Sequence, residues 1–242
     1  MRIALLSDLH GNEVALDAVL ADVSAKGADR IVCLGDTAAL GPSPRAVLAR
    51  LRDLGCPCIL GNHDAFMLDA SLIHGYNDSN SIVRAVDWCR SELSREDLEF
   101  IAGFAPSLSI ELSDRKQLLL FHGSPRSHME DLLCTTSPEM LDDMLAGHLA
   151  AVMAGGHTHI PMLRQHRGML LVNPGSVGMA FERYVCGKVP TLLAHAEWAS
   201  VDASRGHVSV SLHRVELDRR TLRAAAGSVD HPLAAWLCAQ YA

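Results

Sequence analysis

The sequence has no long apolar run and no cluster of basic residues, and each absence argues against a class of protein. No apolar stretch approaches the roughly 20 residues of a membrane-spanning helix, so we expect no membrane partner. The formal net charge is −7, with 21 basic residues against 28 acidic ones. Because binding to a phosphate backbone needs a basic face, we also expect no nucleic-acid duplex as a partner.

The seven cysteines are an odd number and lack the spacing of a disulfide framework. The opening residues "MRIALLSD" do not resemble a secretory signal, because an acidic residue interrupts the apolar stretch. Both features predict a reducing, cytoplasmic location. We interpret the neighbouring Cys56 and Cys58 as small core residues rather than as a redox or zinc pair.

Apolar runs and helical patterns alternate along the first third of the chain. A run at 2–8 precedes a helical pattern over 12–26, and a run at 30–36 precedes a second helical pattern over 43–55. A third apolar run, at 56–64, predicts another strand. This alternation indicates βαβ units with a mostly parallel, buried sheet, and therefore an α/β fold.

Residues 65–116 do not continue this alternation. They read as mainly helical around an irregular stretch at 74–81, and we expect them to cover the active site. No internal repeat or low-complexity linker interrupts the chain, whose length suits a single domain over 1–242.

Strand patterns return in the second half of the chain. Apolar runs predict strands at 117–123, 150–159 and 169–176. The stretches 192–202 and 207–217 alternate apolar and polar residues, which predicts antiparallel strands of a second sheet. A helical tail is expected to end the chain.

Five of the apolar runs end in polar clusters. These clusters are Asp8-Leu9-His10, Gly35-Asp36, Gly61-Asn62-His63-Asp64, His122-Gly123 and Gly155-Gly156-His157-Thr158-His159. Ligands of α/β sheets bind beyond the carboxyl ends of the strands, so the clusters can converge on one site. Uncompensated Asp and His at the ends of buried strands would be costly, and a bound metal would remove that cost.

The residue types in these clusters favour divalent metal ions. The candidate ligands are Asp8, His10, Asp36, Asn62, His122, His157 and His159. Carboxylate, amide and imidazole groups suit Mn, Fe, Zn or a similar ion, and no thiolate is among them. Seven ligands exceed the needs of one tetrahedral ion and suit two ions that share a carboxylate. Such a centre stays net positive and should attract a phosphate group.

Taken in order, these five clusters resemble the motifs of the calcineurin-like metallophosphoesterase superfamily. The stretches "HGSP" at 122–125 and "NPGSVG" at 173–178 resemble its small bacterial and archaeal branch, the YfcE-like or MJ0936-like phosphoesterases. The matched blocks span residues 8–178. After Gly178 the chain reads "MAFERYVCGK", whereas relatives usually continue with a Gln-Pro-Arg type stretch, so the substrate-facing edge is expected to differ.

The resemblance implies a four-layer α/β/β/α sandwich, with two mixed sheets flanked by helices and a dinuclear centre at the strand ends. It implies that one ion is held by Asp8, His10 and His159, and the other by Asn62, His122 and His157, with Asp36 as the bridge. Members are commonly activated by Mn and also use Fe, Zn, Ni or Mg. The implied reaction is hydrolysis of phosphate mono- or diesters of small molecules or nucleotides by a metal-bridging hydroxide.

We expect the three polar residues of "GNHD" to have different roles. If this stretch is extended, neighbouring side chains point to opposite sides, so Asn62 and His63 would not serve the same ion. Asn62 is the expected ligand, because its oxygen adds no charge. His63 is the expected acid for the leaving group, with a pKa near the working pH. Asp64 is expected to orient a neighbouring imidazole.

Six further side chains are candidates for substrate contact: Asn12, His74, Arg126, His128, Arg183 and Tyr184. For Asn12 we favour a structural role, as the cap of the helix that follows it. For the other five we favour a position on the solvated surface without a role in binding. An arginine among them that reached the site could pair with a phosphate.

The sequence leaves several functions open. A phosphodiesterase, a phosphomonoesterase such as a protein phosphatase, and a dinucleoside polyphosphate hydrolase share the same centre. A non-catalytic protein-binding scaffold is the alternative from another class, since the retromer scaffold subunit resembles this fold, but the complete ligand set with His63 favours the enzyme. Neither a G-x-G-x-x-G nor a P-loop pattern follows a predicted strand. Whether the chain forms a homo-oligomer is also open.

Overall fold

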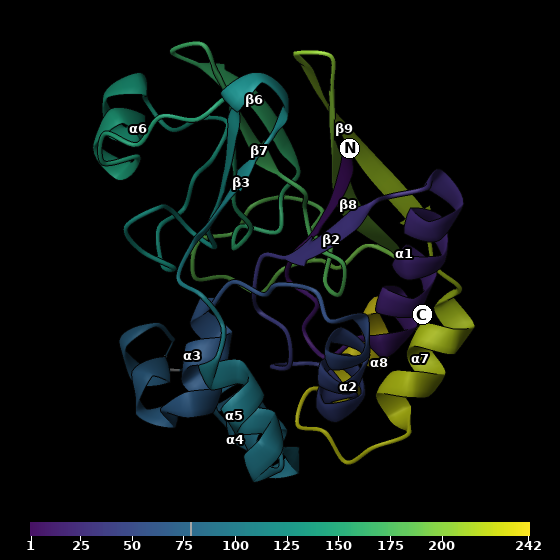
Figure 1. Cartoon of the computed structure of the whole chain (residues 1–242). Coiled ribbons are helices and arrows are strands. Elements are labelled where there is room, and N and C mark those ends of the chain that lie inside the picture. Colours follow the sequence, from purple (N-terminus) through teal and green to yellow (C-terminus); the bar gives the residue numbers. More distant parts are fainter. Residues whose placement is uncertain (78) are drawn as a thin grey trace.

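Figure 1 shows a computed structural model of the chain, which describes residues 1–77 and 79–242. Asp78, in the predicted irregular stretch, lies outside the described residues. The strands are β1 (Arg2–Leu6), β2 (Arg30–Cys33), β3 (Leu108–Glu111), β4 (Gln117–Leu120), β5 (Val152–Ala154), β6 (Met162–His166), β7 (Met169–Asn173), β8 (His195–Ser204) and β9 (His207–Glu216).

The helices are mostly short. They are α1 (Glu13–Lys26), α2 (Pro44–Leu54), α3 (Asn62–Leu68), α4 (Asn80–Glu92), α5 (Arg95–Ala102), α6 (Pro138–Met144), α7 (Arg219–Gly227) and α8 (Ala234–Gln240), with 3-10 turns η1 (Ala70–Gly75) and η2 (Ser113–Arg115). Within residues 1–77 and 79–242, none of them is long and apolar enough to cross a membrane.

The strands form two mixed sheets. The first has the order β2-β1-β8-β9, in which β1 is parallel to β2 and antiparallel to β8. The second has the order β3-β4-β5-β7-β6, in which β4, β5 and β7 are parallel and the edge strands β3 and β6 run antiparallel. Four of the five predicted polar clusters follow the carboxyl ends of β1, β2, β4 and β5.

Successive residues of the central strands belong to different cores, because side chains alternate across a strand. In β1, Ile3 and Leu5 pack in the core between the two sheets, whereas Leu6 packs with the helices on the outer face. In β4, Leu118 faces the core between the sheets, and Leu119 packs towards α6. The result is the four-layer α/β/β/α sandwich that the resemblance implied.

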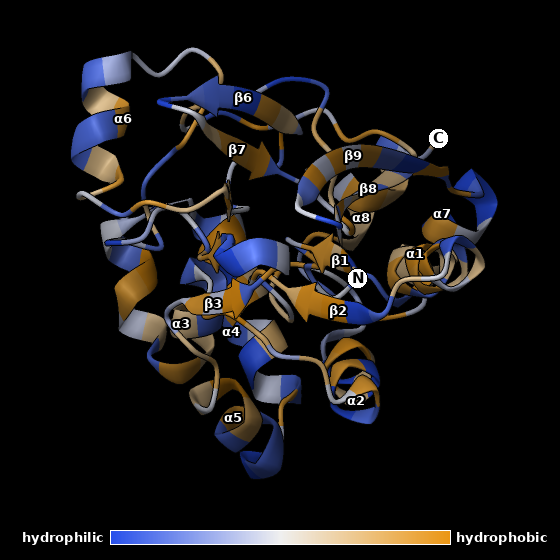
Figure 2. Cartoon of the chain, turned by 45° about the horizontal axis from the view of Figure 1, so that its top comes forward, coloured by the Kyte–Doolittle hydropathy of each residue, from blue (hydrophilic) through white to orange (hydrophobic). Residues whose placement is uncertain are grey.

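Burial on both faces explains why the strands read as continuous apolar runs. In Figure 2, β1 and β2 are hydrophobic over most of their length, whereas helix α2 is hydrophobic on one side only. Both helices that the first third predicts are present. The side chain of Asn12 accepts a hydrogen bond from the N–H of Ala15 (3.1 Å) and starts α1, and Gly55 ends α2 in the left-handed conformation (φ 56°).

The prediction of a third strand at 56–64 is wrong. Cys58 and Ile59 make only isolated bridges, to Cys33 and to Ala105, and α3 begins at Asn62. Gly61 caps this helix, and the side chain of Asp64 accepts a hydrogen bond from the N–H of Gly61 (3.0 Å). This contact, which is one half of a capping box, starts a helix where the sequence pattern suggested an extended end.

The predicted partner of the last two strands is also wrong. The strands β8 and β9 pair with each other as expected, but they extend the sheet of β1 and β2 instead of forming a second sheet. β8 pairs with β1 along the side opposite β2, so the last two strands complete the first sheet. The second sheet consists of strands from the middle of the chain, and one of them, β3, lies inside the range 65–116 that reads as mainly helical.

Candidate metal centre

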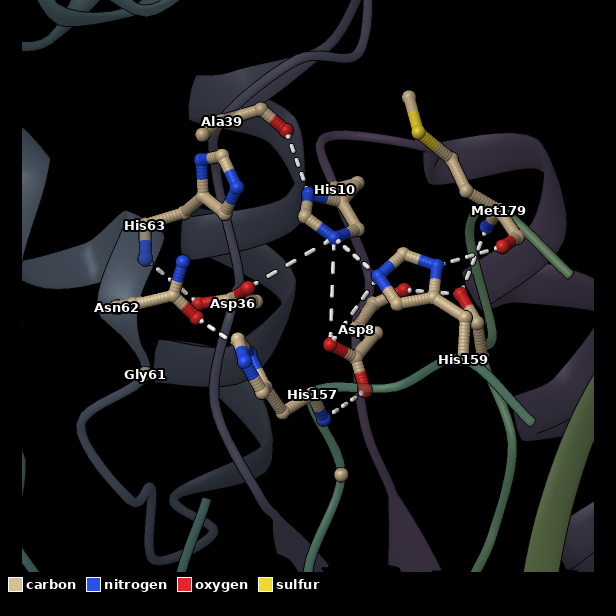
Figure 3. Close-up of polar contacts among 12 residues, drawn as sticks. Asp8, His10, Asp36, Ala39, Gly61, Asn62, His63, His157, His159 and Met179 are labelled. Atoms are coloured by element: carbon tan, nitrogen blue, oxygen red, sulfur yellow. Dashed lines mark hydrogen bonds and ion pairs between the residues drawn. The ribbon is translucent and has the colours of Figure 1, made fainter. Parts of the chain in front are cut away.

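The polar clusters at the strand ends meet at one edge of the sandwich (Figure 3). Asp8 and His10 follow β1, Asp36 follows β2, His122 follows β4, and His157 and His159 follow β5, while Asn62 starts α3. All seven side chains are buried. Because β1 and β2 belong to one sheet and β4 and β5 to the other, both sheets contribute to the site.

Five of the seven residues have a left-handed backbone, which non-glycine residues rarely adopt. Their φ angles are 54° at Asp8, 45° at His10, 56° at Asp36, 70° at His157 and 56° at His159. Each such residue costs on the order of 1–3 kcal/mol, and such strain gathers where function requires a fixed geometry. A Cβ at Gly61 would overlap the carboxylate of Asp36, so only glycine fits there.

The first group of side chains contains Asp8, His10 and His159, whose potential ligand atoms lie within 4.8 Å of one another. The two Nε2 atoms of the histidines are 3.0 Å apart, and His159 Nε2 is 3.4 Å from Asp8 Oδ1. His10 Nδ1 donates to the carbonyl oxygen of Ala39 (3.1 Å), and His159 Nδ1 donates to that of Met179 (2.7 Å). Both Nε2 lone pairs therefore face the carboxylate, an arrangement that a cation among them would stabilise.

The second group contains Asp36, His122 and His157, again with potential ligand atoms within 4.8 Å of one another. Asn62 completes it, because its Oδ1 lies 3.1 Å from His122 Nε2 and 2.9 Å from His157 Nδ1. His122 Nδ1 donates to the carbonyl oxygen of Leu34 (2.7 Å), so its Nε2 lone pair also points inward.

Asp36 lies between the two groups. Its Oδ2 is 3.8 Å from His10 Nε2 and 3.5 Å from His122 Nε2, which is the position of a shared ligand. Burial opposes a charge on His122, but the neighbouring Asp36 carboxylate prevails and raises the pKa of His122 to about 9. The centre thus attracts positive charge even when only a proton is available.

The donor set fits two divalent ions. Among the residues that the structure describes, Asp8 Oδ1 is a buried carboxylate oxygen without a hydrogen-bond partner. An unpaired buried carboxylate oxygen is costly, and a cation would satisfy it. The groups combine carboxylate, amide and imidazole ligands, which suits Mn, Fe, Zn, Ni or Mg better than a soft metal.

His63 lies beside the centre, as expected, but its protonation differs from the prediction. Its backbone N–H donates to Asp36 Oδ1 (2.8 Å), and its ring stands edge-on to that of His10, with centroids 5.2 Å apart. Asn62 and His63 diverge because successive helical residues differ by roughly 100° around the axis. Burial lowers the pKa of His63 to about 4, instead of a value near the working pH.

Asp64 has a different role from the one predicted. Its carboxylate accepts hydrogen bonds from the backbone N–H of Asp36 (2.8 Å) and of Gly61 (3.0 Å), and from both the N–H (2.9 Å) and the hydroxyl (2.7 Å) of Thr37. In the described part of the chain, no imidazole is among its partners. It therefore fixes the loop that carries Asp36 rather than orienting a histidine ring.

The structure does not bring the weaker candidates together at the centre. Asn12 uses both ends of its amide, for the α1 cap and for a bond to the carbonyl oxygen of Gly178 (2.8 Å). Arg126 pairs with Glu130 (2.7 Å) and Asp143 (2.8 Å). These four contacts favour structural roles for both residues.

The remaining candidates lie nearer the surface. The side chains of His74 and Arg183 are exposed, and His128 is half-buried. Burial lowers the pKa of His128, and the charge of Asp36 acts on it in the opposite direction. Tyr184 donates its hydroxyl to Asp131 (2.7 Å).

Several residues around the centre have no signal in the sequence. Tyr76 follows η1, and its ring lies 5.8 Å from that of His63 and 6.3 Å from that of His157. Phe181 stacks on His159 with centroids 4.1 Å apart, and it belongs to the stretch after Gly178 that departs from the family pattern. Such contacts join distant parts of the chain, so local patterns do not reveal them.

Comparison with known proteins agrees with this geometry. A model of the calcineurin-like phosphoesterase superfamily domain matches residues 1–191. The uncharacterized protein MJ0912 of Methanocaldococcus jannaschii is 33% identical over 176 residues, covering 72% of this chain and 69% of that protein.

Two solved structures are similar over nearly the whole chain. A metallophosphoesterase from Sphaerobacter thermophilus has a TM-score of 0.74 at 26% identity, covering 99% of this chain and 100% of its own. The hypothetical protein PH1004 from Pyrococcus horikoshii OT3 shares the fold, with a TM-score of 0.78 at 19% identity and coverage of 98% and 97%. The chain therefore belongs to the calcineurin-like phosphoesterase superfamily.

Proposed function

We propose that the chain is a metal-dependent hydrolase of phosphate mono- or diesters with two divalent ions, Mn being our first choice. The observation that carries this proposal is the pair of inward-facing ligand groups with Asp36 between them. Asp8, His10 and His159 would hold one ion, and Asn62, His122 and His157 the other. When bound, such ions supply a Lewis acid for the phosphoryl oxygens and lower the pKa of water.

The protein's own groups would position these ions and move a proton. Left-handed backbones and main-chain carbonyls fix the histidine rings before any ligand arrives. We assign proton transfer to the departing oxygen to His63, because it is a titratable ring beside the centre that is not among the seven ligands. An anionic phosphate ester beside this ring would oppose the effect of burial on its pKa.

We also propose that part of the segment 65–116 covers the site. The contacts of Tyr76 with His63 and His157 support this, because they bring the chain after η1 against the candidate acid and against one member of the second group. The convergence of all seven ligand residues favours an enzyme over a protein-binding scaffold.

The test is hydrolysis by the Mn-loaded protein. Para-nitrophenyl phosphate, its bis ester, a dinucleoside polyphosphate and a phosphopeptide separate phosphomonoesterase, phosphodiesterase, polyphosphate hydrolase and protein phosphatase. We expect turnover of at least one, lost on removal of the metal. A matched control is His207→Ala, which removes an exposed histidine at the start of β9, outside the ligand groups. Bound metal without turnover of any substrate would contradict the proposal.

A further inference from the structure

His157 is held differently from the other three inward-facing histidines. His10, His122 and His159 each donate Nδ1–H to a main-chain carbonyl and present Nε2 to the centre. His157 is turned the other way. Its Nδ1 faces Asn62 Oδ1 at 2.9 Å, and its Nε2 lies 3.4 Å from Asp131 Oδ1. The group opposite its outer nitrogen is therefore a side-chain carboxylate and not a carbonyl.

The carboxylate of Asp131 is itself held from the other side. Its second oxygen, Oδ2, accepts a hydrogen bond from the hydroxyl of Tyr184 at 2.7 Å. Asp131 lies in the loop between His122 and α6, and Tyr184 lies in the stretch after Gly178 that departs from the family pattern. The chain Tyr184–Asp131–His157 thus connects two loops to one potential ligand.

We propose that Asp131 and Tyr184 are positioning residues that fix the tautomer and orientation of His157, and thereby set the affinity of the second ion site. This inference rests on the metal centre of the proposed function. A carboxylate that accepts from Nε2–H leaves the Nδ1 lone pair free and makes it a stronger ligand. Asp131 is 40% exposed in its side chain, whereas the carbonyls behind the other histidines belong to buried backbone. The second site therefore has the looser support and is the weaker of the two.

An alternative role is a simple tether between the two loops. A tether would change the stability of the fold without favouring one ion over the other. A positioning role changes the affinity of the site that contains His157 and leaves the Asp8, His10 and His159 site as it is. Direct measurement of metal binding separates these roles without any phosphate ester.

The experiment is calorimetric titration of metal-free protein with Mn²⁺, repeated with Co²⁺ to follow the visible spectrum of each site. We expect two binding steps in the wild type. Asp131→Asn should weaken one step by roughly 10- to 100-fold and leave the other unchanged. Tyr184→Phe should weaken the same step by less, and Asp131→Glu should recover part of the loss. The matched control is Asp143→Asn, since Asp143 is an exposed partner of Arg126.

Each outcome decides the inference. Two steps in Asp131→Asn with wild-type constants would overturn it, as would equal weakening of both steps or a wild type that binds only one ion. If Asp131→Asn does not fold, Tyr184→Phe decides, and wild-type binding by that variant would overturn the inference. If the wild type binds two ions and hydrolyses no phosphate ester, the proposed function fails, while selective weakening by Asp131→Asn would still support this inference.

Discussion

Asp64 holds the backbone of Asp36, through a hydrogen bond of 2.8 Å from the Asp36 N–H to Asp64 Oδ2. The same carboxylate accepts from Thr37 and from Gly61, so one buried side chain joins the loop after β2 to the first turn of α3. Asn62 and His63 lie on that turn. The central bridging candidate and the candidate acid are therefore held by a single carboxylate.

Asp64→Asn should destabilise the fold, because an amide nitrogen cannot accept the hydrogen bonds that converge on the carboxylate. We expect a loss of about 2 kcal/mol or more in the free energy of unfolding. Urea unfolding of the metal-free protein measures it. Asp69→Asn is the matched control, since Asp69 is an exposed carboxylate that caps η1 through Ser71. Equal stabilities of the two variants would contradict this role of Asp64.

His63→Ala should separate proton transfer from metal binding. We expect a loss of roughly 10²-fold or more in rate on a substrate with a poor leaving group. The metal content should be unchanged, because His63 is outside both ligand groups. Asn62→Ala should instead weaken the second ion. Full activity of His63→Ala on such a substrate would show that another group is the acid.

The seven ligand candidates could be picked out from the sequence because they stand in short polar clusters that follow apolar runs, which is local information. The helical start at Asn62 could not be found in this way. Cys58 and Ile59 continue an apolar run, and the capping contact between Asp64 and Gly61 outweighs that pattern. The assignment of ligand and acid stands as a prediction, although its reason was wrong, since the side chains diverge around a helix.

Long-range pairing explains most of the remaining differences. The alternation in β8 and β9 predicts antiparallel strands, but it suits either sheet equally, and only the long-range pairing of β8 with β1 distinguishes them. Asp131 and Tyr76 reach the centre from loops distant in sequence, and their surroundings carry no pattern that would single them out.

His231 should make the stability of the fold depend on pH, away from the metal centre. Its Nδ1 accepts a hydrogen bond from the N–H of Leu233 (3.1 Å), and burial lowers its pKa from 6.5 to about 4. In the unfolded chain His231 gains a proton near pH 6.5, whereas in the folded protein it stays neutral until about pH 4. The contribution of neutral His231 to the stability of the fold is therefore complete above pH 6.5, and it decreases as the pH falls from 6.5 to 4.

His231→Asn tests this dependence, because the amide oxygen can replace Nδ1 as the acceptor and does not titrate. We expect the stability difference between wild type and variant to shift in favour of the variant as the pH falls from 6.5 to 4. Urea unfolding at several pH values measures that difference. A difference that stays constant over the window would show that the folded His231 is protonated as readily as the unfolded one.

The most direct test of the account compares wild type with Asp36→Asn, measuring bound Mn and hydrolysis of para-nitrophenyl phosphate and its bis ester on the same samples. Asp53→Asn, which changes an exposed carboxylate, is the control. We predict two ions per chain and turnover in the wild type and the control, with both reduced in Asp36→Asn. Full turnover by Asp36→Asn, or a wild type with two ions and no turnover of either ester, would contradict the account.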